Sequence, residues 1–360
     1  MRQFVLRRVL LAVPVILGIL VVTFTVARLI PGDPCTAALG ERATAEACEA
    51  FNVRFGLDKP IIVQLGIYMR SILVEGDFGN SIRFSRPVSL LLIERLPTTI
   101  ELGLAATFIA VLVGVPAGML SAYKRNSTAD VVTMIGANIG VSMPVYWLGL
   151  MMAYVFAVLL KDTAFWLPPS GQLTPGLLPT PFYEAWGWEL TKDTAAFTIA
   201  DFIANLEIIN SIITAQWSVL QDAIRHLILP SIALSTIPMA IIARITRSSM
   251  LDVLGREYVR AARAKGVIER KVVFKHALRN ALLPIVTVIG LQVGTLFAGA
   301  VLTETIFGWS GVGRALFDAI TGRDFPVIQA FTVVIAIGYV AVNLLVDISY
   351  AFIDPRIKLQ

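Results

Sequence analysis

Six long stretches of this chain contain no Asp, Glu, Lys or Arg, and they limit its possible folds more than any other feature. A helix needs about 20 mostly apolar residues to cross the hydrocarbon core of a bilayer. The stretches hold between 17 and 30 residues, and they cover residues 9–27, 102–123, 131–160, 227–243, 280–303 and 325–346. We therefore predict an all-α polytopic membrane protein with six transmembrane helices.

The composition agrees with this prediction. The chain is 56% hydrophobic and only 15% charged, whereas an average soluble domain has about 25% charged residues. These values exclude a disordered chain and argue against an ordinary soluble enzyme. The first apolar stretch is too long for a cleavable signal peptide, and no small-x-small cleavage site follows it, so it is expected to remain as a helix.

Two segments need separate treatment. The fourth stretch is the shortest and contains Pro230 and Pro238, so its helix is expected to extend by a turn at either end. A seventh apolar segment, 199–220, would immerse Asp201 or Glu207 at a cost of about 2.5–3.5 kcal/mol each near the bilayer centre. Because its apolar residues recur at helical spacing, we predict one amphipathic helix that lies on the membrane or on the protein.

The distribution of charge predicts the orientation. Lys and Arg concentrate on the cytoplasmic side of membrane proteins. With the N-terminus inside, the cytoplasmic side holds 17 basic and six acidic residues, and the outside holds 13 basic and 19 acidic residues. An even number of spans then puts both termini in the cytoplasm of a multi-pass protein of the cell (inner or plasma) membrane. The net charge of +5 reflects this topology and attraction to membrane lipid, not nucleic-acid binding.

These spans divide the chain into an N-terminal transmembrane helix (1–30), an extracytoplasmic segment (31–96), a membrane core (97–353) and a cytoplasmic tail (354–360). The core contains a second extracytoplasmic segment at 161–226 and a long cytoplasmic loop at 244–279. Cys35 and Cys48 lie in the first external segment, where an oxidising compartment permits a disulfide. Two free, partly buried thiols are the alternative.

Glycine and proline residues predict how the spans pack. Three Gly-x-x-x-Gly pairs, at 114 and 118, 136 and 140, and 290 and 294, let helix backbones approach closely. Pro116 and Pro144 lie inside the second and third stretches. Each frees a backbone carbonyl, so each is expected to kink its helix.

Several kinds of chemistry are absent from the sequence. It has no Gly-x-x-x-x-Gly-Lys-Ser/Thr phosphate loop, no HExxH or CxxC motif, and only two histidines, so no catalytic, cofactor-binding or metal-binding residue is predicted. Charged residues approach the spans only at Glu101, Glu304 and Asp347. Proton-coupled carriers usually keep an ionisable residue inside a span. The sequence therefore argues against a carrier or pump, and any energy source must come from another subunit.

The long cytoplasmic loop contains the most informative segment. A helix from Glu257 through Lys265 is expected to stop at Gly266, and a second helix to start near Glu269. Two short helices joined at a glycine form a projecting elbow. The small side chains of Ala261 and Ala262 would let another protein approach closely. The alternative is an amphipathic helix that lies on the inner leaflet.

The pattern Ala261-Ala262-x-x-x-Gly266 resembles the coupling loop of type I ABC importer permeases. The longer run 258–281 is similar to the peptide/nickel branch of that family. Three further segments fit this branch in the same order, at 28–34, 304–326 and 354–358. The chain most resembles the B permease subunit of dipeptide and oligopeptide transporters.

The sequence departs from the family pattern at three places. Arg260 stands where the coupling motif usually has Glu, and the proline that ends the motif comes only at Pro284. The peptide branch accommodates both changes, so they do not imply loss of function. The external segment 161–226 is longer than the family leads us to expect, and it is either a docking element for a binding protein or an insertion.

The resemblance implies a permease subunit of an ATP-driven importer for di- or oligopeptides, and not an enzyme. A second permease would complete the pathway, two ATPase subunits would bind ATP and Mg²⁺, and an extracytoplasmic solute-binding protein would deliver cargo. The implied contacts with the ATPase are Glu257, Tyr258, Ala261, Ala262, Ala264, Lys265 and Gly266.

Alternative functions remain open at this point. Permeases for nickel or glutathione belong to the same branch, and a secondary carrier, a passive channel or a structural scaffold would each need no ATPase. Spans two, three, five and six are candidates for the pathway, but the sequence identifies no residue that contacts the substrate.

Overall fold

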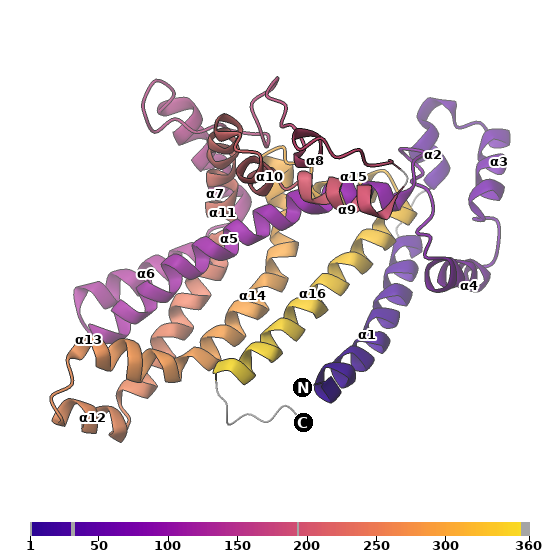
Figure 1. Ribbon diagram of the computed structural model, residues 1–360. Coiled ribbons are helices and arrows are strands. Elements are labelled where there is room, and N and C mark those ends of the chain that lie inside the picture. Colours follow the sequence, from indigo (N-terminus) through magenta and orange to yellow (C-terminus); the bar gives the residue numbers. More distant parts are fainter. Residues whose placement is uncertain (1, 30–32, 193, 354–360) are drawn as a thin grey trace.

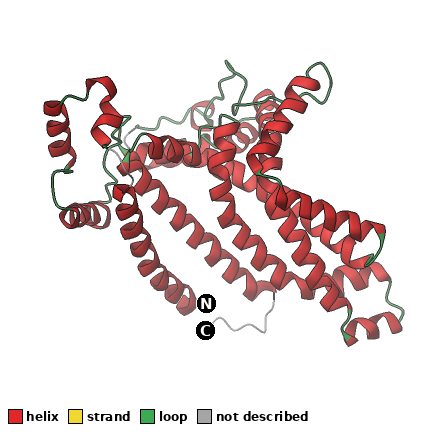
Figure 2. Ribbon diagram, turned by 180° about the vertical axis from the view of Figure 1, so that it is seen from behind, coloured by secondary structure: helices red, strands yellow, loops and turns green. Residues whose placement is uncertain are grey.

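The computed structural model describes residues 2–29, 33–192 and 194–353. Every regular element in these residues is a helix (Figure 2). Neighbouring long helices pack against one another in the order α5, α11, α14, α16 and α1 (Figure 1). Their bounds are α1 (Arg2–Leu29), α5 (Val88–Tyr123), α11 (Trp217–Leu254), α14 (Arg279–Ile306) and α16 (Phe325–Ile353). The predicted all-α class is confirmed.

The shorter helices gather at the two ends of this bundle (Figure 1). The outer end carries α2 (Pro34–Leu39), α3 (Ala45–Phe55), α4 (Ile61–Arg70), α8 (Phe182–Ala185), α9 (Ala195–Ala204), α10 (Glu207–Ile213) and α15 (Val312–Thr321). The inner end carries α12 (Glu257–Ala264) and α13 (Glu269–Lys271), together with the first residues of α1. This arrangement agrees with the predicted sidedness, in which the long loop and the N-terminus share one face.

Five described helices are long and apolar enough to cross a membrane, and the number rises to seven if two bent pairs also count as spans. The exact six-span count and the side of each terminus stay predictions. Residues 30–32 of the motif at 28–34, the motif at 354–358 and the predicted tail lie outside the described residues.

The fourth predicted span is much longer than expected. Helix α11 has 38 residues and contains both Pro230 and Pro238. The expected extension of one turn at either end was therefore too small. Consequently residues 244–254, which we assigned to the cytoplasmic loop, continue the spanning helix as one rigid element.

The third predicted span is wrong as a single kinked helix. Residues 128–142 form α6 (Thr128–Ser142), and the chain then turns by 100° into α7 (Val145–Ala153) and the π-helical turn Tyr154–Leu159. Met143 is extended and Pro144 is the N-cap of α7. The residue before a proline is pushed out of the helical region, so this proline breaks the helix instead of bending it.

The predicted amphipathic helix at 199–220 is also wrong as one element. Helices α9 and α10 meet at 96°, and α11 begins only at Trp217. The physical reason is a tertiary contact, because the Glu101 carboxylate of α5 accepts a hydrogen bond from the Ile208 N–H at 2.7 Å. This bond satisfies a free N–H at the start of α10 and thereby favours a new helix there.

Glycines set the closest helix contacts. A Cβ atom on Gly114 would lie 2.7 Å from the Met239 carbonyl oxygen, and one on Gly118 would overlap the Ala243 carbonyl, so α5 and α11 pack backbone to backbone. Added Cβ atoms on Gly290 and Gly294 would likewise overlap side chains of α16. In the 136–140 pair, a Cβ on Gly140 would make ordinary contact with the Thr236 carbonyl oxygen of α11 at 3.6 Å, whereas Gly136 has nothing within 4 Å in this chain.

Three carboxylates at the ends of predicted spans are buried among the helices. Glu304 is fully buried, and it accepts hydrogen bonds from the Thr99 hydroxyl at 2.6 Å and the Arg314 N–H at 2.9 Å. It thus ties α14 to α5 and to the start of α15. Asp130 and Glu101 are buried as well. All three directly adjoin predicted spans, at 102–123, 131–160 and 280–303, so the prediction that the span interiors hold almost no charged residues is unchanged.

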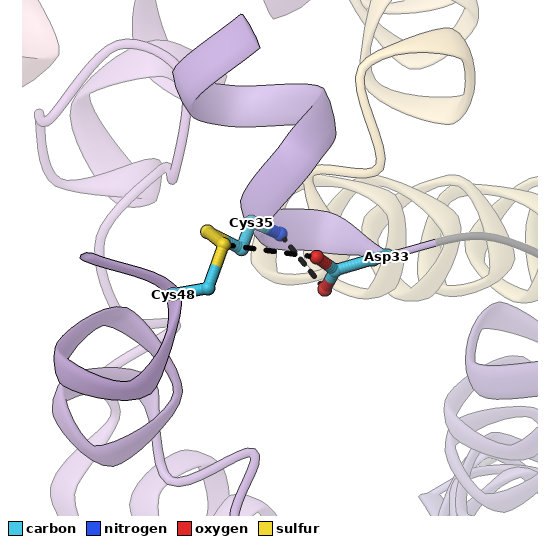
Figure 3. Close-up of side chains that lie close together, drawn as sticks. All are labelled: Asp33, Cys35 and Cys48. Atoms are coloured by element: carbon cyan, nitrogen blue, oxygen red, sulfur yellow. Dashed lines mark hydrogen bonds between the residues drawn. A yellow bond between two sulfur atoms is a disulfide. The ribbon is translucent and has the colours of Figure 1, made fainter. Parts of the chain in front are cut away.

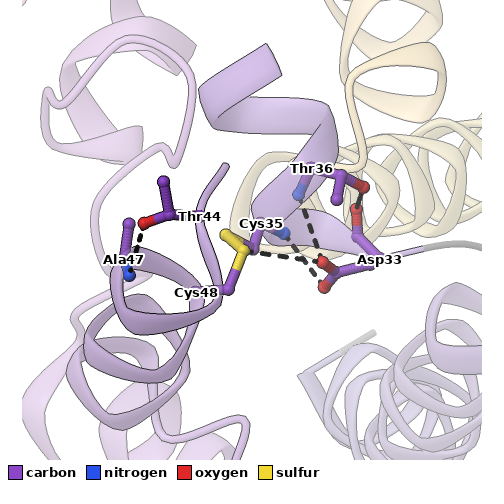
Figure 4. The surroundings of a disulfide bond; sticks show 6 residues. All are labelled: Asp33, Cys35, Thr36, Thr44, Ala47 and Cys48. Carbon is purple, nitrogen blue, oxygen red and sulfur yellow. Dashed lines mark hydrogen bonds between the residues drawn. A yellow bond between two sulfur atoms is a disulfide. The ribbon is translucent and has the colours of Figure 1, made fainter. Parts of the chain in front are cut away.

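Helices α2, α3 and α4 form a lobe at the outer end, and a disulfide joins the first two of them. The Cys35 and Cys48 sulfurs are bonded, with Cα atoms 5.4 Å apart (Figure 3). Asp33 caps α2 by accepting from the Cys35 and Thr36 N–H groups, and Thr44 caps α3 by accepting from the Ala47 N–H (Figure 4). Of the two alternatives for these cysteines, the structure contains the bridge. It joins two helices that share little other packing.

Candidate coupling site at the inner end

The inner end of α11 leads into a compact helical elbow. Helix α11 ends at Leu254, α12 follows, and α13 then continues through the π-helical turn Val272–Leu278 into α14. Figure 1 shows α12 and α13 projecting beyond the long helices. The cytoplasmic loop that we predicted at 244–279 is therefore shorter, at about residues 255–268, and it connects two long helices of the bundle.

Gly266 ends α12 as predicted. Its φ of +75° lies in the left-handed region. The Gly266 N–H donates to the Arg263 carbonyl at 2.9 Å, and the Val267 N–H donates to the Ala262 carbonyl at 3.2 Å. This pair of bonds is the Schellman motif, which satisfies the last carbonyls of a helix and favours glycine at this position. The predicted second helix at Glu269 is also confirmed.

Helix α12 has a buried face and an exposed face. Val259 and Ala262 are buried, and α12 packs against the Val272–Leu278 turn. Ala262, which we expected to face a partner, is buried in this chain, where its small side chain lets α12 lie close to the Val272–Leu278 turn. The other six predicted contact residues are exposed, namely Glu257, Tyr258, Ala261, Ala264, Lys265 and Gly266.

The structure adds apolar residues that sequence reasoning missed. Ile268 is 68% exposed and Phe274 is 55% exposed, and the Tyr258 ring on α12 is exposed as well. A hollow of about 430 Å³ lies between Phe274 and the inner end of α5 at Leu120 and Tyr123. A large apolar residue two positions after the helix-ending Gly266 was the signal in the sequence. Exposed apolar side chains of this kind mark interaction surfaces.

An ion pair closes the elbow. The Arg263 guanidinium donates to the Glu269 carboxylate at 2.8 and 3.2 Å, across the turn at Gly266. This hydrogen bond raises the pKa of Arg263 above its already high value, so the arginine stays charged. Both side chains are about 40% exposed. The pair therefore orients the turn without contributing much stability.

A second ion pair joins α11 to the neighbouring helices just before the elbow. Arg247 donates to both carboxylate oxygens of Asp130 at 2.7 and 2.8 Å. Asp130 also accepts hydrogen bonds from the Ser121 hydroxyl and from the Asn126 N–H. The cluster links α11, α6 and α5 into one unit.

Residues 114–359 match the family described as binding-protein-dependent transport system inner membrane component, and residues 1–103 match the N-terminal family of such components. The chain belongs to this family. It is accordingly a multi-pass inner membrane component of a transport system, and the predicted resemblance to a type I ABC importer permease is confirmed.

Similar proteins extend over the whole chain of this inner membrane component. It is 45% identical to the dipeptide transport system permease protein DppB of Alkalihalophilus pseudofirmus, over 99% of this chain and 100% of that protein. It is 42% identical to DppB of Escherichia coli K12, over 99% of each chain. The oligopeptide transport system permease protein AppB of Bacillus subtilis is 37% identical over 99% of this chain and 100% of its own length.

Proposed function

We propose that this chain is the permease subunit of an ATP-driven importer for dipeptides and short oligopeptides. The relatives named as dipeptide and oligopeptide permeases support this cargo, because they match the chain from end to end. Nickel and glutathione remain cargo of the same branch, but the relatives reported above do not favour them. A transport system that depends on a binding protein also argues against a free-standing carrier or channel.

The elbow is the observation that carries the proposal. It presents an exposed face from Glu257 to Gly266 directly after α11. Helix α11 is the most buried of the five long helices, so the elbow is attached to the centre of the bundle. We propose that this face docks into an ATPase subunit that binds ATP and Mg²⁺. Closure of two such subunits would draw two elbows together. The Arg247–Asp130 pair would then pass this displacement from α11 to α5 and α6.

The proposal includes two further partners. A second, related permease would form the other half of the pathway. A solute-binding protein would dock on the outer end, which carries α8, α9 and α10 and also the lobe of α2, α3 and α4 (Figure 1). Helices α8, α9 and α10 belong to the external segment 161–226, and we propose that this segment is the docking element that the sequence left open.

Gentle purification followed by transport measurement tests the proposal. The tagged chain is extracted from its native membrane, and co-purifying proteins are identified by mass spectrometry. The assembly is then reconstituted in vesicles with its binding protein. We expect a second permease, ATPase subunits, and ATP-dependent dipeptide uptake that excess nickel or glutathione does not inhibit. A chain that purifies alone, or uptake without ATP, would contradict the proposal.

A further inference from the structure

Two arginines one turn apart on α11 have different surroundings. Arg247 forms the bidentate ion pair with Asp130. Arg244 is exposed, and it donates to the Asn138 side-chain oxygen of α6 at 3.0 Å. Within the described residues no carboxylate lies within 4.0 Å of the Arg244 guanidinium. Its charge is therefore uncompensated by this chain.

Arg244 and Asn138 both belong to helices that contain predicted spans, α11 and α6. Asp130 is in the first turn of α6, and Asn138 follows eight residues later, which corresponds to about 12 Å along a helix. Arg244 precedes Arg247 by three residues, or about 4.5 Å towards the bilayer centre. A charged side chain at this depth avoids lipid and faces a water-filled cavity or another polar group. We therefore infer that the exposed side of Arg244 faces water or a polar partner and not lipid.

A shallow, open hollow lies beside Asn138 at the break between α6 and α7, and Arg244 reaches it only through its hydrogen bond to Asn138. It has a volume of about 640 Å³, and Asn138, Ser142, Tyr146 and Trp147 are among its lining residues. Binding sites for small molecules typically measure 300–1,000 Å³ and combine aromatic walls with a few polar groups. The turn at Pro144 creates the hollow, because it directs α7 away from the axis of α6 by 100°. The site therefore depends on the break that the sequence did not predict.

We propose that Arg244, held by Asn138, binds the carboxylate at the C-terminus of a peptide on its way through the permease. This inference rests on the proposed function and names the part of the substrate that the pathway recognises. A guanidinium binds a carboxylate through two parallel, charge-assisted hydrogen bonds. The terminal carboxylate is common to all peptides whatever their side chains. The rings of Tyr146 and Trp147 offer an apolar wall on which varied side chains can pack.

Uptake by the complete reconstituted transporter tests this assignment. One dipeptide is supplied as the free acid and as the C-terminal amide, each at a concentration that saturates the same binding protein. We expect Arg244→Gln to reduce uptake of the free acid about tenfold, because hydrogen bonds to charged groups are among the strongest. Uptake of the amide should change little, so the preference for the acid is lost. Arg244→Lys keeps the charge and should retain part of that preference.

Arg125→Gln serves as the matched control, because Arg125 is also exposed but lies in the short turn between α5 and α6. This variant should keep the full preference for the acid. A second measurement replaces Tyr146 by a photoreactive phenylalanine analogue, and a labelled free-acid dipeptide should crosslink there unless Arg244 is also changed to Gln.

The outcomes separate the two proposals. If the unaltered assembly transports no peptide, the proposed function is wrong. If it transports peptide and Arg244→Gln leaves the acid-to-amide ratio unchanged, this inference fails while the function stands. Loss of the second permease from purified Arg244→Gln would show instead that a partner carboxylate pairs with Arg244, which also overturns the assignment.

Discussion

Helix α11 passes through two regions that are stabilised in opposite ways. Along α5 its backbone lies against Gly114 and Gly118 with no room for a Cβ atom. Beyond Leu254 the elbow is held by its own cap at Gly266 and by the exposed Arg263–Glu269 pair. The seam with α5 therefore determines whether the protein folds, and the elbow determines what the folded protein contacts. Substitutions in the two regions should separate stability from transport.

The largest effect is expected where the seam is fixed to α6. Asp130→Ala leaves the Arg247 guanidinium without its carboxylate and removes the acceptor of Ser121 and Asn126. Loss of one partner of a buried pair costs about 3–5 kcal/mol, and the partial exposure of Arg247 suggests the lower end. We expect a large fall in thermal unfolding temperature in detergent. The double variant Asp130→Ala with Arg247→Met should recover part of it; equal instability of both variants would contradict this account of the pair.

The next largest effect is expected at the centre of the seam. Gly118→Leu places a side chain against the Ala243 carbonyl and Thr246, so α5 and α11 must separate. Overpacking of this kind costs about 1–3 kcal/mol or more. Gly136→Leu is the matched control, because nothing lies within 4 Å of that glycine. Size-exclusion chromatography of the detergent-solubilised chains should show loss of monodisperse protein only for Gly118→Leu.

Gly266→Val should affect the elbow and spare the bundle. Valine at φ +75° is strained by about 1–2 kcal/mol, although no neighbouring atom obstructs its Cβ. We expect ATP-driven uptake to fall about tenfold, since 1.4 kcal/mol corresponds to a factor of ten, while the unfolding temperature stays near that of the unaltered chain. Gly176→Val, at φ +93° in the outer loop, carries similar strain and should transport normally. Normal transport by Gly266→Val would show that the elbow is not the coupling contact.

The smallest effect is expected from Glu269→Gln. This change removes the exposed ion pair with Arg263, which is worth about 0.2–1 kcal/mol. Uptake should fall by less than about fivefold, and the difference from the unaltered chain should shrink at high salt, where exposed charges are screened. A salt-independent loss as large as that of Gly266→Val would mean that Glu269 contacts the ATPase directly.

Much of the fold could be predicted because the bilayer constrains a sequence so strongly. A segment without charges has few options other than to span, and five of the six predicted stretches lie in single long helices. The end of α12 at Gly266 was also predictable, because a helix that stops in the left-handed region favours glycine. These features depend on residues close together in the chain.

The features that the sequence did not reveal depend on contacts between distant residues. Glu101 contributes to the break before Ile208 from another helix, and Asp130 meets Arg247 across 117 positions. Ala262 looked like part of an exposed surface until the packing of α12 placed it inside. Solvent exposure and charge pairing are properties of neighbours in space, and they determine which residues remain available to a partner.

The sequence by itself thus determined the membrane-spanning class and the position of the elbow, because lipid and backbone geometry act locally. Only the tertiary structure decided that the third stretch turns by 100° at Pro144, that Arg247 is paired and that Arg244 is not. Proline can bend or break a helix, and an arginine can form an ion pair with a carboxylate or lack one. In both cases the choice depends on the groups that the rest of the fold brings alongside.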